Sequence, residues 1–173
     1  MAALSGLKLV DFGAFIAGPY AARILGDLGA TVIKVEPPGG DDSRGYGPWL
    51  EGDSAYFMSL NRGKESIVLD LKNDKDRKVF NNLLSETDVL VENFRPGTMA
   101  KLGFAWETIH KHHPKLIYAA CSGFGQTGPD SSRPARTRNH PSFPGNGPWE
   151  DARNNELRFR RDRALGGRYS PPC

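Results

Sequence analysis

The sequence predicts an α/β protein in which helices flank a parallel β-sheet, followed by an irregular tail. Two observations support this fold class. Short apolar runs rich in β-branched residues alternate with amphipathic runs up to about residue 134, and strand–helix–strand units with short connections form parallel sheets. Runs such as VLV (89–91) and LIYAA (116–120) are apolar on both faces, as expected for strands that helices cover on both sides.

The first strand and the first helix are expected near the N-terminus. Residues 7–12 (LKLVDF) predict the strand, and the helix follows at Pro19. Proline suits the first turn of a helix because its missing N–H has no partner there, and Gly29 suits the end of the helix. The apolar residues expected on the buried face of this helix are Ala21, Ile24, Leu25 and Leu28.

Four further strands and two further helices are expected along the chain. Asn73 is suited to cap a helix whose apolar stripe is Val79, Phe80, Leu83 and Leu84. Another helix is expected around Thr108. The remaining strands are predicted at residues 31–36, 66–71, 88–92 and 115–122.

Five loops follow the predicted strands, at the sheet edge where α/β proteins bind ligands. Four of the five contain glycine, which lets a backbone approach a ligand closely. They indicate a binding site without specifying its chemistry. The loops are GAFIAGP (13–19), EPPGGDDSRG (36–45), DLKND (70–74), ENFRPG (92–97) and SGFGQTGP (122–129).

The first of these loops has two interpretations. Gly13 and Gly18 precede a helix, and Glu36 ends the second strand, where an acid that binds a ribose would lie in a nicotinamide dinucleotide site. The spacing matches neither G-x-G-x-x-G nor a phosphate-binding loop. A plain tight turn is therefore the favoured interpretation, with the dinucleotide site as the alternative.

Residues after the third and fourth strands suit a phosphorylated nucleotide. Lys72 supplies positive charge, while Asn93, Phe94 and Arg95 add an amide, an aromatic face and a second cation. Cations bind phosphate, and an aromatic ring can stack on a base. The alternative is a solvated lysine and an asparagine in a turn. Taken alone, these residues favour this alternative.

No metal site is expected. His110, His112 and His113 lie in a predicted helix without a third ligand nearby, and zinc sites require three or four placed ligands. Cys121 is expected to be a small buried strand residue without an activating base.

Composition changes sharply near residue 135. Residues 134–173 contain eight Arg, no Lys and four acidic residues, and they contain no Val, Ile or Met. Such a segment buries too little apolar surface to offset its ordering entropy. We therefore expect a folded domain at 1–134 and a disordered Arg/Pro-rich tail at 135–173. Nucleic acid or acidic lipid is the alternative partner of the tail, disfavoured by its acidic residues.

The sequence contains no window suited to cross a membrane and begins with no secretory signal. Its two cysteines do not form a disulfide framework. We expect a cytoplasmic protein, or one of the mitochondrial matrix if its source is eukaryotic.

Taken together, the loops resemble one known family. LSGLKLVDFG, AGPYAARILGDLGATVIKVEPPGGDDSR, YFMSLNRGKESIVLDLK, DVLVENFRPGTMAKLGF and SGFGQTGP follow one another as in the family III CoA-transferases. This family includes formyl-CoA, carnitine and dicarboxylate CoA-transferases and the α-methylacyl-CoA racemases. The resemblance extends from residue 4 to about 134 and covers only the N-terminal part of a family member.

The resemblance implies a Rossmann-like half-domain that holds coenzyme A or acyl-CoA, as substrate rather than as a permanently bound cofactor, at the strand ends. Full-length relatives form interlocked homodimers. Lys101 stands where some members have Arg, and Gly123, Phe124 and Gly125 match the glycine-rich loop near the thioester. The residues that match CoA-binding positions are Leu69, Asp70, Leu71, Lys72, Asn93, Phe94, Arg95, Lys101, Gly123, Phe124 and Gly125.

The resemblance also implies a reaction in which CoA passes between an acyl-CoA and a carboxylic acid through an aspartyl intermediate. The aspartate of the family lies in a segment like G-x-x-D-G-P-P, which this sequence lacks: Asp151 and Asp162 lie in other contexts. The His–Asp pair of the racemases has no match either, because His140 is out of register. No catalytic residue is therefore predicted.

The acceptor is expected to be a dicarboxylate rather than formate, because Ile16 and Pro37 replace a Gln and an Arg of the formyl-CoA enzymes. We expect a truncated, inactive CoA-transferase. The alternatives are a non-catalytic CoA-binding module or subunit, and a racemase-type fragment.

The abrupt change of composition predicts a frameshift or an altered splice near codon 135. Translating the coding DNA in three frames beyond that codon tests this hypothesis. Absence of a D-G-P-P-like segment from every frame would refute it. We also expect a half-sheet of this kind to aggregate, since it leaves an edge and apolar surface exposed.

Overall fold

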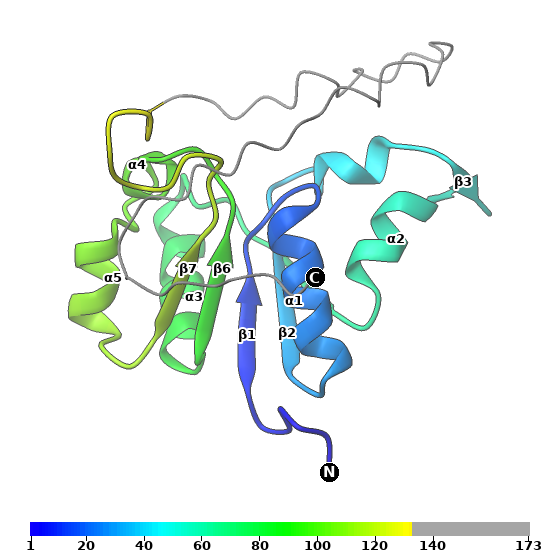
Figure 1. Ribbon diagram of the computed structural model, residues 1–173, viewed down its shortest axis with the longest axis horizontal. Coiled ribbons are helices and arrows are strands. Elements are labelled where there is room, and N and C mark those ends of the chain that lie inside the picture. The colour runs from blue at the N-terminus through cyan, green and yellow to red at the C-terminus, as the bar shows by residue number, and fades with distance from the viewer. Residues whose placement is uncertain (133–173) are drawn as a thin grey trace, which may run out of the picture. The chain divides into compact units, whose positions relative to one another are not determined.

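The computed structural model describes residues 1–132. Its centre is a five-stranded parallel sheet in the order β5-β2-β1-β6-β7, as Figure 1 shows. The chain therefore runs outward from β1 to one edge, returns to the middle at β6 and continues to the other edge. The strands are β1 (Lys8–Asp11), β2 (Thr31–Glu36), β5 (Glu65–Val68), β6 (Val89–Glu92) and β7 (Ile117–Ala120).

Helices connect these strands, and the predicted α/β class is confirmed. The α-helices are α1 (Ala17–Asp27), α2 (Ala55–Asn61), α3 (Asp74–Ser85), α4 (Thr98–Lys101) and α5 (Trp106–His112). A 3₁₀ helix, η1 (Asp42–Gly45), and a short antiparallel pair, β3 (Trp49–Leu50) with β4 (Asp53–Ser54), lie between β2 and α2.

All five predicted strands are present, but several short elements were missed. The sequence predicted a loop where η1, β3, β4 and α2 lie, and it did not predict α4. These elements have two to seven residues, which is too short for a clear hydrophobic period. A local signal for α2 existed in Ser54, whose hydroxyl accepts a hydrogen bond from Phe57 N and caps the helix.

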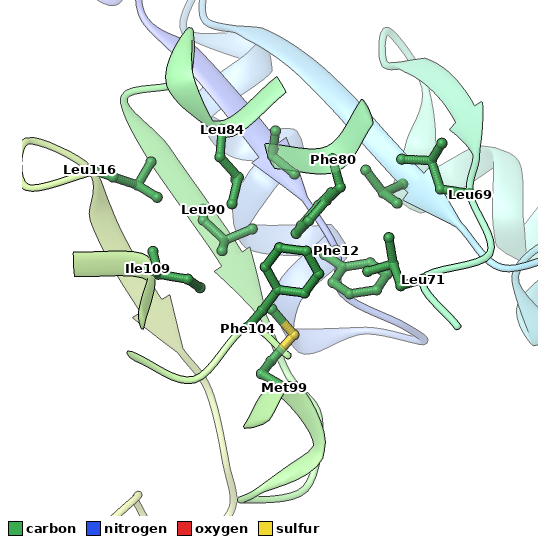
Figure 2. Packing of buried hydrophobic residues seen from close by; sticks show 12 residues of the cluster. Phe12, Leu69, Leu71, Phe80, Leu84, Leu90, Met99, Phe104, Ile109 and Leu116 are labelled. Carbon is green, nitrogen blue, oxygen red and sulfur yellow. The ribbon is translucent and has the colours of Figure 1, made fainter. Parts of the chain in front are cut away.

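The larger part of the core lies on the face of the sheet that α3 and α5 cover. Phe80 of α3 lies at its centre, with its ring 5.4 Å from that of Phe12 and 4.8 Å from that of Phe104. Figure 2 shows these three rings together with the surrounding aliphatic side chains. The buried members of the cluster are Val10, Phe12, Val35, Leu69, Leu71, Phe80, Leu84, Leu90, Met99, Phe104, Ile109 and Leu116.

A smaller cluster lies on the opposite face, under α1. It consists of Leu9, Val32 and Val91 from the sheet and Ala22 from the helix. Both faces of the central strands are thus covered, as their continuous apolar character predicted.

Of the four residues predicted on the buried face of α1, only Leu25 packs against this smaller cluster. Ala21, Ile24 and Leu28 are exposed, and the helix buries Gly18, Pro19 and Ala22 instead. A hydrophobic period favours the larger aliphatic side chains, whereas the close approach of α1 to the strands selects the small ones. A Cβ on Gly26 of α1, for example, would lie 3.3 Å from Cγ2 of Val32 on β2.

The end of the predicted fifth strand also differs from the expectation. Strand β7 ends at Ala120, and Cys121 is an exposed loop residue rather than a buried strand residue. Ile117 is 62% exposed, because β7 is an edge strand in the described part of the chain and only β6 pairs with it there.

The helix-end signals were read correctly. Asn73 Oδ1 accepts a hydrogen bond from Asp76 N at 2.8 Å at the start of α3, and Gly29 has a φ of +105° just after α1. No helix within residues 1–132 has the length and apolar character that a bilayer span requires. The predicted tail, 135–173, lies outside the described residues, so the domain boundary near 134 remains a prediction.

Candidate functional site

The two central strands, β1 and β6, mark the point where the strand order reverses. The chain leaves β1 toward one edge of the sheet and leaves β6 toward the other, so the loops after these strands diverge. In open α/β sheets this divergence is where ligands bind. The loops concerned are Gly13–Ile16 after β1 and Asn93–Gly97 after β6.

Asn93 joins these two loops. Its Oδ1 accepts a hydrogen bond from Ala14 N at 2.7 Å, and its Nδ2 donates one to Ala14 O at 2.7 Å. The sequence assigned Asn93 to ligand binding, and the structure adds a second role: its amide connects the loops on the two sides of the switch point.

Side chains of β1 and β2 also hold the loop after β1 in place. Asp11 Oδ1 accepts a hydrogen bond from Gly13 N at 2.9 Å, and Lys34 Nζ donates one to Gly13 O at 2.9 Å. A Cβ on Gly13 would lie 2.9 Å from Pro19 Cδ and 3.0 Å from Gly18 Cα. The two glycines are therefore accounted for by a tight turn that folds back against α1.

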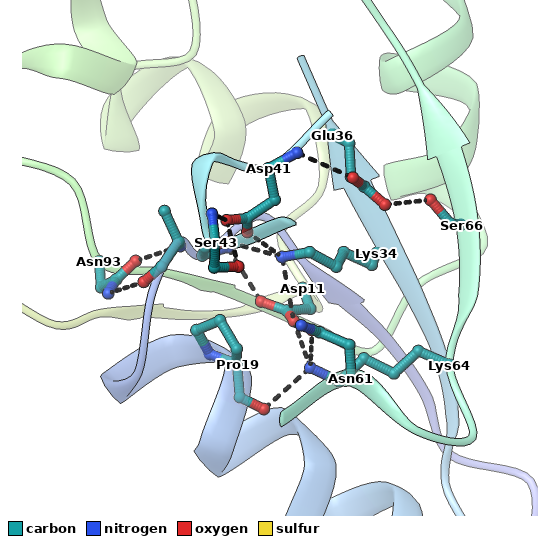
Figure 3. Close-up of polar contacts among 12 residues, drawn as sticks. Asp11, Pro19, Lys34, Glu36, Asp41, Ser43, Asn61, Lys64, Ser66 and Asn93 are labelled. Carbon is teal, nitrogen blue, oxygen red and sulfur yellow. Dashed lines mark hydrogen bonds and ion pairs between the residues drawn. The ribbon is translucent and has the colours of Figure 1, made fainter. Parts of the chain in front are cut away.

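Beneath this loop lies a buried network of opposite charges, drawn in Figure 3. Lys64 Nζ is 2.7 Å from Asp11 Oδ2, and Lys34 Nζ is 2.8 Å from Asp41 Oδ2. Burial lowers the pKa of Lys64, and the charge of Asp11 opposes that change. For Asp41, burial alone would raise the pKa, but hydrogen bonds from Lys34 and Ser43 outweigh it and hold the pKa below its usual value.

This network was not predicted from the sequence. A signal was present, because Asp11 and Lys34 interrupt otherwise apolar strands. Charged residues are fully buried only when they are paired, so each of them implied a partner. The identity of that partner depends on which strands are neighbours.

Glu36 belongs to the same region. Its carboxylate accepts two hydrogen bonds from Arg44, at 2.7 and 2.8 Å, and one from Ser66 Oγ at 2.6 Å. The hydrogen bonds from Arg44 are the main reason that its pKa falls to about 2, against the opposing effect of burial. The guanidinium of Arg44 lies 3.8 Å above the centre of the Phe57 ring. The acid proposed for a ribose is thus bound within the protein.

A second buried glutamate, Glu92, ends β6. It accepts hydrogen bonds from Phe94 N at 2.6 Å and from Tyr118 Oη at 3.0 Å. Burial raises the pKa of Glu92, and these two hydrogen bonds lower it in part. Glu92 therefore holds the start of the loop that carries Asn93 and Phe94, a function that the sequence analysis missed.

The predicted site residues after β5 divide into buried and exposed ones. Leu69 and Leu71 point into the core, whereas Lys72 is exposed. Asp70 Oδ1 accepts a hydrogen bond from Lys72 N at 3.0 Å, and Asp70 N donates to Asp76 Oδ2 at 2.8 Å. The leucines anchor this turn, and the lysine side chain extends from it.

The predicted residues after β6 and β7 are mostly exposed. The Phe94 ring packs edge-on against Phe12 with 4.8 Å between ring centres, which connects it to the same core as Leu69 and Leu71. Arg95 and Lys101 are exposed. The remaining predicted residues, Gly123, Phe124 and Gly125, lie in the exposed loop after β7.

The histidines do not form a site in the described part of the chain. His110 stacks on Trp106 with 4.8 Å between ring centres. Burial lowers the pKa of His113, and the neighbouring His112 lowers it further. Within residues 1–132, no three His, Cys, Asp or Glu side chains are grouped as metal ligands.

An open cleft of about 370 Å³ lies between α3 and α5, away from the predicted site. Arg77, Asn81 and His112 are among its lining residues, and no predicted site residue is. The predicted residues lie instead in or near the segments that follow β5, β6 and β7.

The fold and this loop-built region define a doubly wound α/β protein with its candidate site at the switch point. Residues 4–139 match the model of CoA-transferase family III. The chain belongs to this family, as its loop sequences predicted.

Two of the similar proteins are CoA-transferases whose names specify a donor and an acceptor. Over 131 residues the chain is 54% identical to an acetyl-CoA:oxalate CoA-transferase of Acetobacter aceti. The aligned segment covers 75% of this chain and 34% of that protein. It is 46% identical over 132 residues to the succinyl-CoA:glutarate CoA-transferase of Homo sapiens, covering 75% and 30%. The chain thus spans about a third of the length of these relatives.

Solved structures agree with the fold. A CAIB/BAIF family protein from Brucella suis superimposes with a TM-score of 0.73 at 43% identity, covering 77% of this chain and 36% of that one. A hypothetical protein from Mycobacterium tuberculosis gives a TM-score of 0.73 at 42% identity, covering 79% and 38%.

Proposed function

We propose that this chain carries part of the acyl-CoA site of a CoA-transferase whose acceptor is a dicarboxylic acid. The observation that carries the proposal is the continuous family match over residues 4–139. It includes all the strand-end loops in which the CoA-binding residues are expected. The relatives support the acceptor class, since their names specify oxalate and glutarate.

The phosphates of CoA are assigned to exposed cations. Lys72, Arg95 and Lys101 are exposed and lie on the turn after β5, the loop after β6 and the end of α4. Cations of this kind form charge-assisted hydrogen bonds with phosphate oxygens. Lysine at position 101 supplies charge without the planar two-point contact of arginine.

The base and the thioester are assigned to the remaining predicted residues. Phe94 offers a ring already held against Phe12, so little side-chain entropy is lost when a base packs on it. Gly123, Phe124 and Gly125 form an exposed loop suited to a close backbone approach to the thioester. Leu69 and Leu71 contribute indirectly, by anchoring the turn that carries Lys72.

We further propose that this chain alone does not transfer CoA. The exchange requires a carboxylate nucleophile that attacks the thioester. The family places it in a segment like G-x-x-D-G-P-P, which this sequence does not contain. The chain would then bind CoA without exchanging acyl groups.

Calorimetry with CoA tests the binding proposal. We expect micromolar binding, and Lys72→Ala should weaken it by roughly tenfold because a charge-assisted hydrogen bond is lost. Lys75→Ala is the matched control, since Lys75 is an exposed lysine of α3 outside the predicted site. Equal losses in the two variants, or no binding by the unmodified chain, would contradict the proposal.

An exchange assay tests the catalytic part separately. The purified chain is incubated with acetyl-CoA or succinyl-CoA and with oxalate or glutarate, and CoA thioesters are separated by chromatography. We expect no new thioester above the rate without protein. Formation of oxalyl-CoA or glutaryl-CoA would show that the chain holds a nucleophile of its own.

A further inference from the structure

The loop Gly13–Ile16 is bound by side chains at four backbone groups in succession. Asp11 accepts from Gly13 N and Lys34 donates to Gly13 O, each at 2.9 Å. Asn93 accepts from Ala14 N and donates to Ala14 O, each at 2.7 Å. These side chains come from β1, from β2 and from the loop after β6, so three parts of the chain determine the shape of one short loop (Figure 3).

The residue that follows is strained. Phe15 has a φ of +60°, a left-handed conformation that is unfavourable for residues other than glycine. Its ring centre lies 5.9 Å from that of Tyr46, yet 37% of the residue is exposed. Such strain persists only where the surroundings impose it, and it concentrates at ligand sites. Here the hydrogen bonds to Gly13 and Ala14 fix the two residues that precede Phe15.

Close packing leaves the Asn93 amide little freedom. A Cβ at position 18 would lie 3.4 Å from Asn93 Oδ1, so the small residue at the start of α1 makes room for the amide. Nδ2 and Oδ1 each already make a 2.7 Å hydrogen bond to Ala14. This geometry favours a role of Asn93 in ordering the loop over a direct contact between its amide and a ligand.

We propose that Asn93 is a positioning residue that holds Gly13–Ile16 in its strained conformation. In this conformation Phe15 and Ile16, both exposed at the switch point, form one wall of the acyl-CoA site. The inference rests on the proposed function for the identity of the ligand. It assigns the effect of Asn93 on binding to the shape of the loop rather than to a direct contact between its side chain and CoA.

The first experiment needs no ligand. Hydrogen exchange at the Ala14 amide is measured by NMR in the full chain, in Asn93→Ala and in Asn82→Ala, a control on the exposed side of α3. We expect Asn93→Ala to speed exchange at Ala14 by roughly tenfold or more, because the acceptor of that amide is lost. Asn82→Ala should leave it unchanged. An unchanged rate in Asn93→Ala would overturn the inference.

Asn93→Asp provides a second variant in case Asn93→Ala does not fold, which circular dichroism will show. The introduced carboxylate keeps an acceptor for Ala14 N and loses the donor to Ala14 O. We expect an increase in exchange over the unmodified chain that is smaller than tenfold, because the donor to Ala14 O is lost while an acceptor for Ala14 N remains. An exchange rate equal to that of the unmodified chain would overturn the inference in this variant too.

The second experiment is a double-mutant cycle on CoA affinity. Phe15→Asn removes the strain, because asparagine tolerates a positive φ. If Asn93 acts through the loop, Asn93→Ala weakens CoA binding by roughly tenfold in the unmodified chain and by at least about threefold less in the Phe15→Asn background, whose own affinity accounts for the lost Phe15 contact. Additive losses would instead indicate a direct contact and overturn the positioning role.

The two experiments separate this inference from the proposed function. If the unmodified chain binds no CoA, the proposed function fails and the assignment of the loop as a wall of the site fails with it. The exchange rates at Ala14 would still decide whether Asn93 orders the loop. If the chain binds CoA and the cycle is additive, the proposed function stands and the inference alone is wrong.

Discussion

Lys64 shows how one side chain can join several elements. Its Nζ donates to Asp11 Oδ2 at 2.7 Å and to Pro19 O and Asn61 Oδ1 at 2.8 Å each, and the side chain is 2% exposed. These bonds connect the end of β1, the first turn of α1 and the last residue of α2. The lysine is satisfied within the protein, so its charge stabilises the site rather than contacting a ligand.

We predict that Lys64→Met destabilises the protein by about 3–5 kcal/mol, because it removes the cation 2.7 Å from the buried Asp11 carboxylate and leaves only Lys34, at 4.0 Å. The matched control is Lys72→Met, which changes the free energy of unfolding by less than about 0.5 kcal/mol, since Lys72 is exposed. Urea denaturation at pH 7 measures both. Similar effects in the two variants would show that the buried ion pair does not matter for stability.

Glu36 predicts a pH dependence of stability. Its pKa in the folded protein is about 2, below the usual value of 4.5 for a glutamate. A carboxyl group with a lowered pKa stabilises the fold above pH 4.5, and this contribution is lost as the pH falls from 4.5 toward 2. We therefore expect the urea midpoint to fall across this range.

The matched variant is Glu36→Gln, which keeps the size of the side chain and removes its titration. We expect it to be less stable than the unmodified chain at pH 7 and to show a smaller decline in urea midpoint between pH 5 and pH 2. Parallel declines in the two proteins would attribute the acid sensitivity to other groups.

Among the helices, α3 makes the main contribution to the core on its face. Phe80 and Leu84 are buried, whereas Val79 on the same helix is 38% exposed. The Asn73 cap and the acidic Asp74 and Asp76 in the first turn favour the start of this helix. The helix therefore combines a well-formed N-terminus with a narrow buried stripe.

We predict that Phe80→Ala destabilises the protein by about 3–5 kcal/mol, through lost burial and the cavity left between Phe12 and Phe104. Val79→Ala should cost less than about 1 kcal/mol because Val79 is partly solvated. Chemical denaturation of both variants provides the measurement. A cost below about 1 kcal/mol for Phe80→Ala would mean that this core rearranges to fill the space.

Helix α1 presents apolar side chains to the solvent on its outer face. Ile16, Tyr20, Ile24 and Leu28 recur every four residues and are 42–51% exposed, so they form one stripe. The opposite face consists of the small residues that pack against the strands. A helix with apolar residues on both faces is typically buried on both, so the outer face of α1 is a surface that other parts of a protein can cover.

At the level of the whole described domain, both edges of the sheet carry exposed aliphatic residues. Val68 on β5 is 56% exposed and Ile117 on β7 is 62% exposed. Exposed apolar edge strands pair readily with other chains. This chain spans about a third of the length of its relatives. The rest of a relative's chain is available to cover the corresponding surfaces.

We predict that the purified chain associates with itself in a concentration-dependent manner, as light scattering would show. Ile117→Lys should reduce this association, because a charge on an edge strand opposes pairing. Asn82→Lys is the control for net charge, since it adds the same charge to an exposed polar position on α3. Equal effects of the two variants would indicate a general charge effect, and a monomer at all concentrations would refute the prediction.

The strands could be predicted because each is a local apolar run bounded by turn residues, such as TVIKVE before PPGG. The helix-end residues Asn73 and Gly29 could be predicted because capping depends on neighbouring residues. The buried face of α1 could not be predicted, because the helix packs so closely on the sheet that the small side chain of Ala22 is buried there. Short elements such as α2 also escaped, since seven residues carry too little periodicity.

The candidate site divides in the same way. The amino-acid sequence alone established the α/β class, the family and the strand-end loops, because these are encoded in local patterns and in the order of motifs. Pairing Lys64 with Asp11, 53 positions apart, and Asn93 with Ala14, 79 positions apart, depended on the strand order. Parallel strands bring together side chains that are distant in the sequence, and only the folded sheet specifies which ones meet.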